Sequence, residues 1–335
     1  MSVNPILMMG GSGAIGRLSA QMLRNLHQDA PFLIAGRNIE KAQAVAKELG
    51  NAEAVQLDLG ADDLGLGSRQ VGAVAVFYSD ESLAGLRYAN SRALPHLGIS
   101  SGVFEIAPEI AIFMHKPDAG AVVLGYEWLV GATTVPTLQL AKKFDRIDEI
   151  KIGALVDEED GGGPAVAEDF ERLSKMMSAA LTRRDGAYIW RDGDDAQALF
   201  HAIDGTEIKA SGFSSIDVAG LATATGAKNV QFDLATGVSS ARRRGEPKST
   251  EIIIELSGKD HDRQPLRTRH AVFHPGGAAP LTAMGVTMIL ERLTGLDGRA
   301  PAPPGLYFPY QLIGPDTYLH RLEAAGGSVL TLNLP

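Results

Sequence analysis

The stretch ILMMGGSGAIGRLSAQMLRN, residues 6–25, joins a short apolar run to a helical pattern through a group of glycines. An apolar run bounded by glycine is typical of a buried parallel strand, and apolar residues then recur at helical spacing from Ile15 to Leu26. Between them, Gly11, Gly13 and Gly16 fit the pattern G-x-G-x-x-G. In that pattern glycines permit a tight turn, the approach of bare backbone to a pyrophosphate, and close helix–strand contact. The stretch therefore predicts a strand, turn and helix that bind a dinucleotide.

A P-loop is the other phosphate cradle with similar glycine spacing, but its chemistry is missing. It needs Lys followed by a Ser or Thr that binds Mg²⁺, whereas this chain has Arg17 and Leu18 there. We therefore expect a pyrophosphate at the helix N-terminus, where backbone N–H groups and the helix dipole attract anions. The predicted contacts are Gly11, Ser12, Gly13, Ala14, Ile15 and Gly16.

The end of the second apolar run, PFLIAGR at residues 31–37, indicates which dinucleotide binds. Folds that select NAD usually place Asp or Glu there to hold the ribose 2′-hydroxyl, and this chain has Gly36 and Arg37. Arg37, with Asn38 and Lys41, can form charge-assisted hydrogen bonds with a 2′-phosphate. This pattern predicts NADP as the cofactor. The alternative is that Arg37 is a surface residue at the start of the helix NIEKAQAVAKELG.

Further apolar runs continue the same alternation of strands and helices. The run AEAVQLDL places Asp58 beside the expected adenine, and VGAVAVFYS places Tyr78 and Ser79 near the expected nicotinamide. A helix over residues 83–98 and strands near 101–106 and 120–125 follow. The order predicts an α/β fold with a doubly wound parallel sheet, a Rossmann domain spanning residues 1–130.

After Gly131 the pattern changes to strands separated by Gly, Asp and Asn turns. These predict an α+β domain with a mostly antiparallel sheet over residues 131–275, including a helix that opens at Pro164 and extends to Leu181. The run AAPLTAMGVTMILERLTG predicts a helix at the start of a final segment, residues 276–335.

Composition excludes several classes of function. The chain has 335 residues, a formal net charge of −9 and no cysteine, which argues against nucleic-acid binding, disulfides and thiolate metal sites. The basic run ARRRGEPK, residues 241–248, is typical of a solvated hairpin loop. No stretch has the length or apolarity of a membrane span or a signal peptide, so we expect a cytoplasmic protein without a membrane partner.

Four quoted segments together resemble the saccharopine dehydrogenase-like NAD(P)-binding oxidoreductases. They are GGSGAIG, AGRNIEKAQAVAKELG, GYEWLVGATTVPTLQLAKKFDRIDEIKIG and APPGLYFPYQLIGPDTYLHRLEAAGG. The resemblance implies a Rossmann domain, an inserted α+β domain that often dimerises through its sheet, and a final segment, residues 276–335, that folds back beside the cofactor domain. It also implies chemistry on C–N bonds of amino-acid-derived imines or, in related proteins, on C=C bonds. Several members carry a G-x-D-P-G-like turn facing the substrate. Glu127 matches its acid, while Leu129 and Val130 depart from it.

Candidate catalytic residues follow from position and chemistry. Tyr126 and Glu127 come directly after a strand of the cofactor sheet, where ligands meet the carboxyl ends of strands. We expect Glu127 to stabilise an iminium cation, Tyr126 to line the cleft, and His270 to contribute from the second domain. His274 lies four residues after His270 in a predicted strand, and no carboxylate pattern nearby indicates a metal site. The alternative for Glu127 is a structural role, as a cap or ion pair at the hinge between the domains. Tyr78 and Glu81 could contact the substrate or could be ordinary loop residues, and both readings stay open.

Three functions remain open from the sequence. The first is an NADPH-dependent oxidoreductase acting on a C=N or C–N bond of a small molecule. The second is a C=C or carbonyl reductase, although the Tyr-x-x-x-Lys pair of short-chain dehydrogenases, G-x-S-x-G and H-E-x-x-H are all missing. The third is a non-catalytic NADP sensor. We also expect a homodimer, because TEIIIEL at residues 250–256 is an apolar strand that a symmetric pairing would cover.

Overall fold

The computed structural model describes residues 4–161, 168, 171–172, 175 and 178–334, and the chain divides into two compact units. Unit 1 comprises Met1–Tyr126 and Thr282–Ile313, and unit 2 comprises Glu127–Leu281 and Gly314–Pro335. The division after Tyr126 precedes the predicted boundary at residue 130. The segment predicted as one tail, 276–335, is shared by both units, because its two short strands join different sheets.

Unit 1 is built on a seven-stranded parallel sheet, which confirms the predicted doubly wound fold. The strand order is β15-β6-β5-β4-β1-β2-β3, so the direction of winding reverses between β1 and β4. The strands are β1 (Ile6–Met9), β2 (Phe32–Ala35), β3 (Ala52–Val55), β4 (Ala73–Val76), β5 (His96–Gly98), β6 (Ala121–Leu124) and β15 (Gly305–Tyr307). The helices are α1 (Ala14–Leu26), α2 (Ile39–Leu49), α3 (Ala84–Ser91), α4 (Ile106–His115) and α10 (Pro309–Leu312), with most of α9 (Ala278–Thr294).

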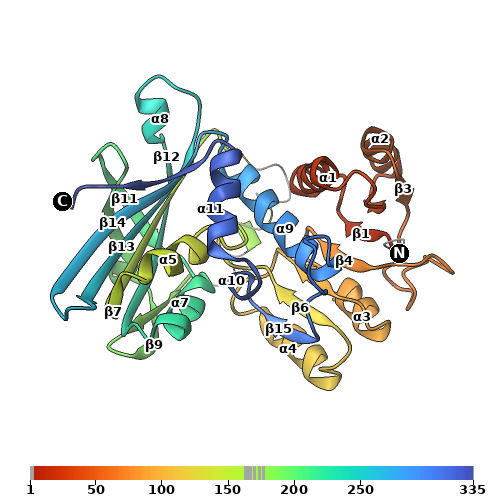
Figure 1. The fold of residues 1–335 in the computed structure, drawn as a ribbon, viewed down its shortest axis with the longest axis horizontal. Coiled ribbons are helices and arrows are strands. Elements are labelled where there is room, and N and C mark those ends of the chain that lie inside the picture. Colours follow the sequence, from red (N-terminus) through yellow and green to blue (C-terminus); the bar gives the residue numbers. More distant parts are fainter. Residues whose placement is uncertain (1–3, 162–167, 169–170, 173–174, 176–177, 335) are drawn as a thin grey trace. The chain divides into compact units, whose positions relative to one another are not determined.

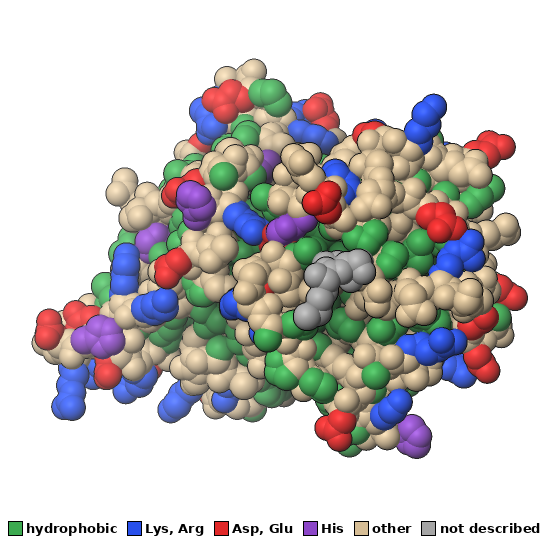
Figure 2. Space-filling model, turned by 45° about the vertical axis from the view of Figure 1, so that its right-hand side comes forward, with side chains coloured by type: hydrophobic (Ala, Val, Ile, Leu, Met, Phe, Trp, Pro, Cys, Tyr) green, Lys and Arg blue, Asp and Glu red, His purple; other side chains and the backbone are tan. Residues whose placement is uncertain are grey.

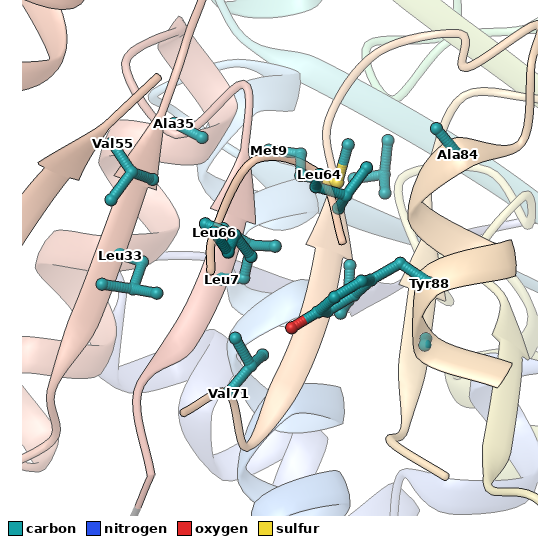
Figure 3. Close-up of a cluster of buried hydrophobic side chains, with 13 residues drawn as sticks. Leu7, Met9, Leu33, Ala35, Val55, Leu64, Leu66, Val71, Ala84 and Tyr88 are labelled. Atoms are coloured by element: carbon teal, nitrogen blue, oxygen red, sulfur yellow. The ribbon is translucent and has the colours of Figure 1, made fainter. Parts of the chain in front are cut away.

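Both faces of this sheet are covered, which explains why its strands are apolar throughout. Figure 1 shows α1, α2 and α9 over one face and α3 and α4 over the other. On the face of α3, Tyr88 packs with Leu64 and Leu66 from the segment between β3 and β4 (Figure 3). Each fully buried Leu contributes roughly 1.5–3 kcal/mol. The long connection between β3 and β4 therefore serves as part of the core where a helix would otherwise pack.

Two elements of unit 1 differ from the prediction. The helix predicted over residues 83–98 ends at Ser91, and the strand predicted near 101–106 is β5, at His96–Gly98. Pro95 accounts for the difference, because a proline inside a helix removes a backbone hydrogen bond and clashes with the preceding turn. Residues 101–105 instead lead into α4. The sequence analysis missed this helix because it assigned a strand to the residues just before it.

Unit 2 contains a nine-stranded mixed sheet that is mostly antiparallel, as predicted. The order is β10-β11-β12-β7-β13-β14-β16, with β8 paired to β12 and to β9. Among the described residues of this sheet, only β7 and β12 pair in parallel. The strands are β7 (Phe144–Asp157), β8 (Ala180–Arg184), β9 (Ala187–Arg191), β10 (Gln197–His201), β11 (Glu207–Gly212), β12 (Asn229–Gly237), β13 (Thr250–Asp260), β14 (Pro265–His274) and β16 (Ser328–Thr331). The helices are α5 (Thr134–Ala141), α7 (Asp217–Thr225), α8 (Ser240–Arg243), α11 (Pro315–Ala324) and the 3-10 helix η1 (Gly193–Ala196).

Three further sequence-based predictions for unit 2 can be compared with the structure. The helix predicted from Pro164 lies largely outside the described residues, and its predicted end at Leu181 is wrong because Leu181 belongs to β8. The apolar strand TEIIIEL forms β13 inside the sheet, between β7 and β14, and its isoleucines are buried. The cations of the run ARRRGEPK form ion pairs within the chain, for example Arg243 with Asp204 at 2.7 Å.

Candidate functional site

The glycine turn between β1 and α1 shows which glycines serve packing and which face open space. A Cβ on Gly16 would lie 2.7 Å from the carbonyl oxygen of Gly10 and 2.7 Å from the Cα of Gly11, so this position requires glycine for helix–strand contact. A Cβ on Gly13 would meet only the carbonyl oxygen of Gly10, at 3.2 Å. Gly10 has a φ of +84°, which favours glycine in the turn. The bare backbone at Gly13 is therefore the place where a ligand can approach.

The N-terminus of α1 fits a phosphate group. Gly13 is the N-cap residue, no side chain caps the helix, and its first turn contains no acidic residue. The first N–H groups of a helix need acceptors, and an anion placed there also meets the positive end of the helix dipole. The loop at Ser12 and the first turn of α1, at Ala14 and Ile15, thus offer backbone donors of the kind that a pyrophosphate requires.

The residues predicted to select the cofactor occupy the end of β2. Arg37 is exposed and forms no hydrogen bond or ion pair with any described residue, so its guanidinium is available to a ligand. Asn38 has a structural role, because its side chain accepts a hydrogen bond from the backbone N–H of Lys41 at 2.9 Å and caps α2. Lys41 is exposed in the first turn of that helix.

The other predicted cofactor contacts differ in their surroundings. Asp58 is exposed and accepts a hydrogen bond from the backbone N–H of Gly60 at 2.9 Å, so it also shapes its own turn. Tyr78 is half-buried, and a Cβ on Gly10 would lie 3.1 Å from its ring. Burial raises the pKa of Tyr78 to about 12, so its phenol stays protonated. Ser79 follows it at the carboxyl end of β4.

A polar cluster that the sequence analysis missed lies at the carboxyl ends of β5 and β6. The Tyr126 hydroxyl donates a hydrogen bond to Glu109 Oε2 at 2.5 Å, and Ser101 Oγ donates one to Glu109 Oε1 at 2.8 Å. Glu109 is buried, and burial raises the pKa of its carboxyl above the ordinary value, while both hydrogen bonds oppose that shift. Burial also raises the pKa of Tyr126 well above its usual range. A single acid within the apolar helix IAPEIAIFMH was the signal that could have indicated Glu109.

His96 of β5 lies beside this cluster. A Cβ on Gly98 would be 2.7 Å from the Tyr126 hydroxyl and 3.5 Å from His96 Cε1, so both rings approach the same glycine. His96 is buried, and its Nδ1 forms no hydrogen bond with any described residue. Burial lowers its pKa to about 4, which keeps the imidazole neutral at physiological pH. Buried polar atoms without partners are uncommon, so this atom marks a place where a ligand can supply one.

Glu127, the predicted cation stabiliser, belongs to unit 2, whereas Tyr126 belongs to unit 1. Its side chain is 3% exposed and accepts a hydrogen bond from Thr134 Oγ1 at 2.7 Å. The turn that follows is unusual, because Leu129 and Val130 have φ values of 51° and 56°. A branched residue such as Val rarely adopts this left-handed conformation, and such strain occurs most often at functional sites.

The strained turn is fixed to unit 2 by the residue before it. The backbone N–H of Trp128 donates to Asp217 Oδ2 at 2.7 Å, and the Trp128 ring contacts Phe213 edge-on at a centroid distance of 5.5 Å. It also contacts Phe232 at 5.6 Å. Burial raises the pKa of Asp217 to about 6. These contacts hold the backbone around Glu127 in place.

The two histidines of β14 have different surroundings. His270 is buried, with Nδ1 3.4 Å from Thr331 Oγ1, and its Nε2 bonds to no described residue. Burial lowers its pKa. His274 uses both ring nitrogens within unit 2: Nδ1 accepts from the backbone N–H of Gly276 at 2.9 Å, and Nε2 lies 3.1 Å from the Ala325 carbonyl oxygen. His274 therefore shapes the turn before α9.

Neither a metal site among the described residues nor a basic patch on the face drawn in Figure 2 is evident. No group of three or more His, Asp or Glu residues among those described is arranged to hold a metal ion. On the face shown in Figure 2, acidic and basic side chains are interspersed. None of the described helices combines the length and apolarity needed to cross a membrane.

Comparison with known proteins bears on the fold. No protein-family model and no curated protein matches the chain. Among solved structures, the chain is similar to saccharopine dehydrogenase (L-Glu forming) from Saccharomyces cerevisiae, with a TM-score of 0.66 and 15% identity over 98% of this chain and 100% of that one. It is also similar to myo-inositol dehydrogenase from Lactobacillus casei in complex with NAD(H) and myo-inositol, with a TM-score of 0.50 and 10% identity over 100% of this chain and 98% of that one.

These likenesses confirm the predicted fold and its resemblance to saccharopine dehydrogenase. Both solved structures belong to dehydrogenases, and both are matched over nearly their whole length. The chain therefore has the two-part α/β fold found in NAD(P)-binding oxidoreductases.

Proposed function

We propose that this protein is an NADP-dependent oxidoreductase that transfers a hydride to or from a C–N bond of an amino-acid-derived small molecule. The observation that carries the cofactor proposal is the pairing of open backbone at Gly13 with the exposed, unpaired guanidinium of Arg37. One feature accommodates a pyrophosphate and the other a 2′-phosphate. The C–N substrate class rests on the resemblance to saccharopine dehydrogenase-like proteins.

The residues of unit 1 have separable tasks in this proposal. The turn from Gly11 to Gly16 would hold the pyrophosphate, Arg37 and Lys41 the 2′-phosphate, and Asp58 would border the adenine. Bound NADPH supplies the hydride. Tyr78, Ser79 and Tyr126 lie at the carboxyl ends of β4 and β6, the edge of the sheet where ligands of such folds bind.

A carbonyl or C=C reductase is the second candidate, and one observation favours it. Reduction of a carbonyl needs a proton donor at oxygen, and Tyr78 remains protonated because burial raises its pKa to about 12. A non-catalytic NADP sensor would need only the glycine turn and Arg37, without the buried polar cluster around Glu109.

Cofactor selection by Arg37 provides the first test. A charge-assisted contact to the 2′-phosphate contributes roughly 1.5–3 kcal/mol, so NADPH should bind about ten- to a hundredfold more tightly than NADH. Fluorescence titration measures both affinities, and Arg37→Ala should remove most of the difference. Arg87→Ala, at a surface position on α3, is the matched control. Equal affinities for the two nucleotides, or unchanged discrimination in Arg37→Ala, would refute the proposed NADP preference.

The reaction itself is tested by supplying substrates. Purified protein with NADPH is assayed against 2-oxo acids paired with amines, simple aldehydes and ketones, and activated alkenes, with nicotinamide absorbance as the readout. Turnover only with oxo acid and amine together supports the C–N proposal. Turnover of carbonyls or alkenes alone supports the second candidate, and NADPH binding without turnover of any class supports the sensor.

A further inference from the structure

The hydrogen-bond arrangement at Tyr126 specifies what its hydroxyl can offer to a ligand. A phenol has one hydrogen and can accept through its oxygen. The hydrogen of Tyr126 points to Glu109 Oε2, and Glu109 Oε1 is occupied by the hydroxyl of Ser101. Because that hydrogen is already used within the protein, the Tyr126 oxygen can act only as an acceptor. The Ser101 hydroxyl is also within its reach, and a phenol oxygen still has a lone pair for a ligand.

We infer that Tyr126, oriented by Glu109, accepts a hydrogen bond from an N–H group of the substrate, so that the site takes a cationic amine or iminium nitrogen in preference to an oxygen at the same position. A carbonyl oxygen has no hydrogen to donate, and an alcohol donates one without a positive charge. This inference rests on the proposed function and names the substrate group that the reaction centre would recognise. In this arrangement Tyr126 contacts the substrate, while Ser101 and Glu109 are positioning residues.

The surroundings of the pair favour a positive charge. Glu105 and Asp80 are close enough to act electrostatically on Glu109, and both are acids. Each is held by backbone N–H groups: Glu105 by Gly102 at 2.6 Å and Asp80 by Gly85 at 2.8 Å. These carboxylates are therefore fixed in place before a ligand arrives, so little reorganisation is needed to stabilise a cation.

His96 is an independent observation that points to a ligand at the same place. It is 5% exposed, its ring lies beside Gly98 together with the Tyr126 hydroxyl, and its Nδ1 bonds to no described residue. A neutral imidazole provides one acceptor nitrogen and one N–H donor. With Nε2 protonated, Nδ1 is a second acceptor on a ring that approaches Gly98 as the Tyr126 hydroxyl does, which suits a nitrogen that carries more than one hydrogen.

The test measures binding with matched pairs of compounds that differ only at the group in question. The pairs are glutamate and 2-hydroxyglutarate, leucine and 2-hydroxyisocaproate, and phenylalanine and phenyllactate. Calorimetry on the protein with and without NADP gives both affinities. We expect the amino member of at least one pair to bind about tenfold or more tightly than its hydroxy partner, the effect of a charged hydrogen bond.

Variants then assign the discrimination to Tyr126. Tyr126→Phe removes the acceptor and should abolish the preference for the amino compound. Tyr88→Phe removes a hydroxyl from a buried core tyrosine of the same unit and should leave the preference intact. Thermal unfolding of each variant verifies that the fold is retained.

Glu109→Gln provides a sharper variant because it reverses one hydrogen bond. The glutamine oxygen can still accept from Ser101, while its amide N–H₂ then faces Tyr126 and donates to the phenol oxygen. The tyrosine hydrogen becomes free to point toward the ligand, so the preference should shift toward the hydroxy compound. Glu53→Gln, at an exposed acid paired with Arg69, is the matched control.

The outcomes separate this inference from the cofactor proposal. The inference is overturned if no amino compound binds, if hydroxy compounds bind equally well, or if Tyr126→Phe keeps the discrimination. A wild-type protein that fails to bind NADPH contradicts the proposed function, and the amino and hydroxy affinities of the cofactor-free protein still decide the inference.

Discussion

At the scale of single residues, His96 gives the structure a defined response to pH. Burial lowers its pKa to about 4, compared with 6.5 for an ordinary histidine. Between these values the unfolded chain binds a proton that the folded chain does not, so folding stability is complete above pH 6.5 and decreases as the pH falls toward 4. The shift corresponds to about 3 kcal/mol.

Chemical denaturation at pH 7.5 and pH 4.5 tests this expectation. The free energy of unfolding should fall between pH 7.5 and pH 4.5 in both proteins. In His96→Gln this fall should be smaller than in the wild type by roughly 2–3 kcal/mol. His115→Gln, at an exposed histidine that ends α4, should behave like the wild type. An equal pH response of wild type and His96→Gln would show that His96 titrates normally in the fold.

Glu127→Gln tests the sequence-based assignment of a catalytic carboxylate. If Glu127 stabilises a cation during reaction, the variant should keep NADPH affinity and lose about a hundredfold in turnover, or roughly 2.7 kcal/mol of transition-state stabilisation. The hydrogen bond from Thr134 and the burial of Glu127 suit a structural role instead. Lowered thermal stability with near-normal turnover would assign it that role and direct attention to Tyr126, His270 and Tyr78.

At the scale of elements, the glycine turn permits a paired test. Gly13→Val should retain the fold after a shift of a few tenths of an ångström, because a Cβ there lies 3.2 Å from the Gly10 carbonyl oxygen and meets no other described atom, and it should abolish NADPH binding. Gly16→Ala should instead destabilise the protein by about 1–3 kcal/mol, because its Cβ would contact backbone atoms at 2.7 Å. Thermal unfolding and NADPH titration of both variants separate the two roles. Unchanged NADPH binding by Gly13→Val would mean that the turn does not hold the cofactor.

The sequence predicted elements where one periodic pattern dominated. The parallel strands and the glycine turn were evident because buried strands and helices leave distinct spacings, as at Ile6–Met9 and Ala14–Leu26. The short strand β5 was misplaced because Pro95 is the single sequence signal that separates it from the preceding helix α3. Glu109 was missed because its partners, Ser101 and Tyr126, come together only when two strands align, and no local spacing encodes that contact.

At the scale of the whole molecule, the expected homodimer cannot form through β13, the apolar strand on which the sequence-based expectation rested. The isoleucines of β13 are buried, and both edges of the strand are paired with β7 and β14, so neither offers a surface to a partner. Exposed apolar side chains occur at the outer strands of the same sheet: Tyr188 and Trp190 on β9 and Leu199 on β10. An end strand also has unpaired backbone groups that a second copy can satisfy.

Light scattering at micromolar concentration tests this assembly. We expect the wild type to be a dimer, and Leu199→Asp, at a position 61% exposed, to shift it toward the monomer without altering NADPH affinity. Leu26→Asp, 53% exposed on α1, is the control with a similar change at another surface. A monomeric wild type would contradict the prediction of a dimer.

The way β15 joins the first sheet has a consequence for synthesis on the ribosome. Its partner β6 ends at Leu124, yet Gly305–Tyr307 is translated only after nearly all of unit 2. About 180 residues separate the two strands, which takes roughly ten to forty seconds at ordinary elongation rates. During that interval the nascent Rossmann sheet lacks its last strand and α9, so an edge of backbone donors and acceptors is open. Chaperone dependence should therefore concentrate in this window, and stalled chains that end before residue 305 should aggregate more readily than those that extend beyond it.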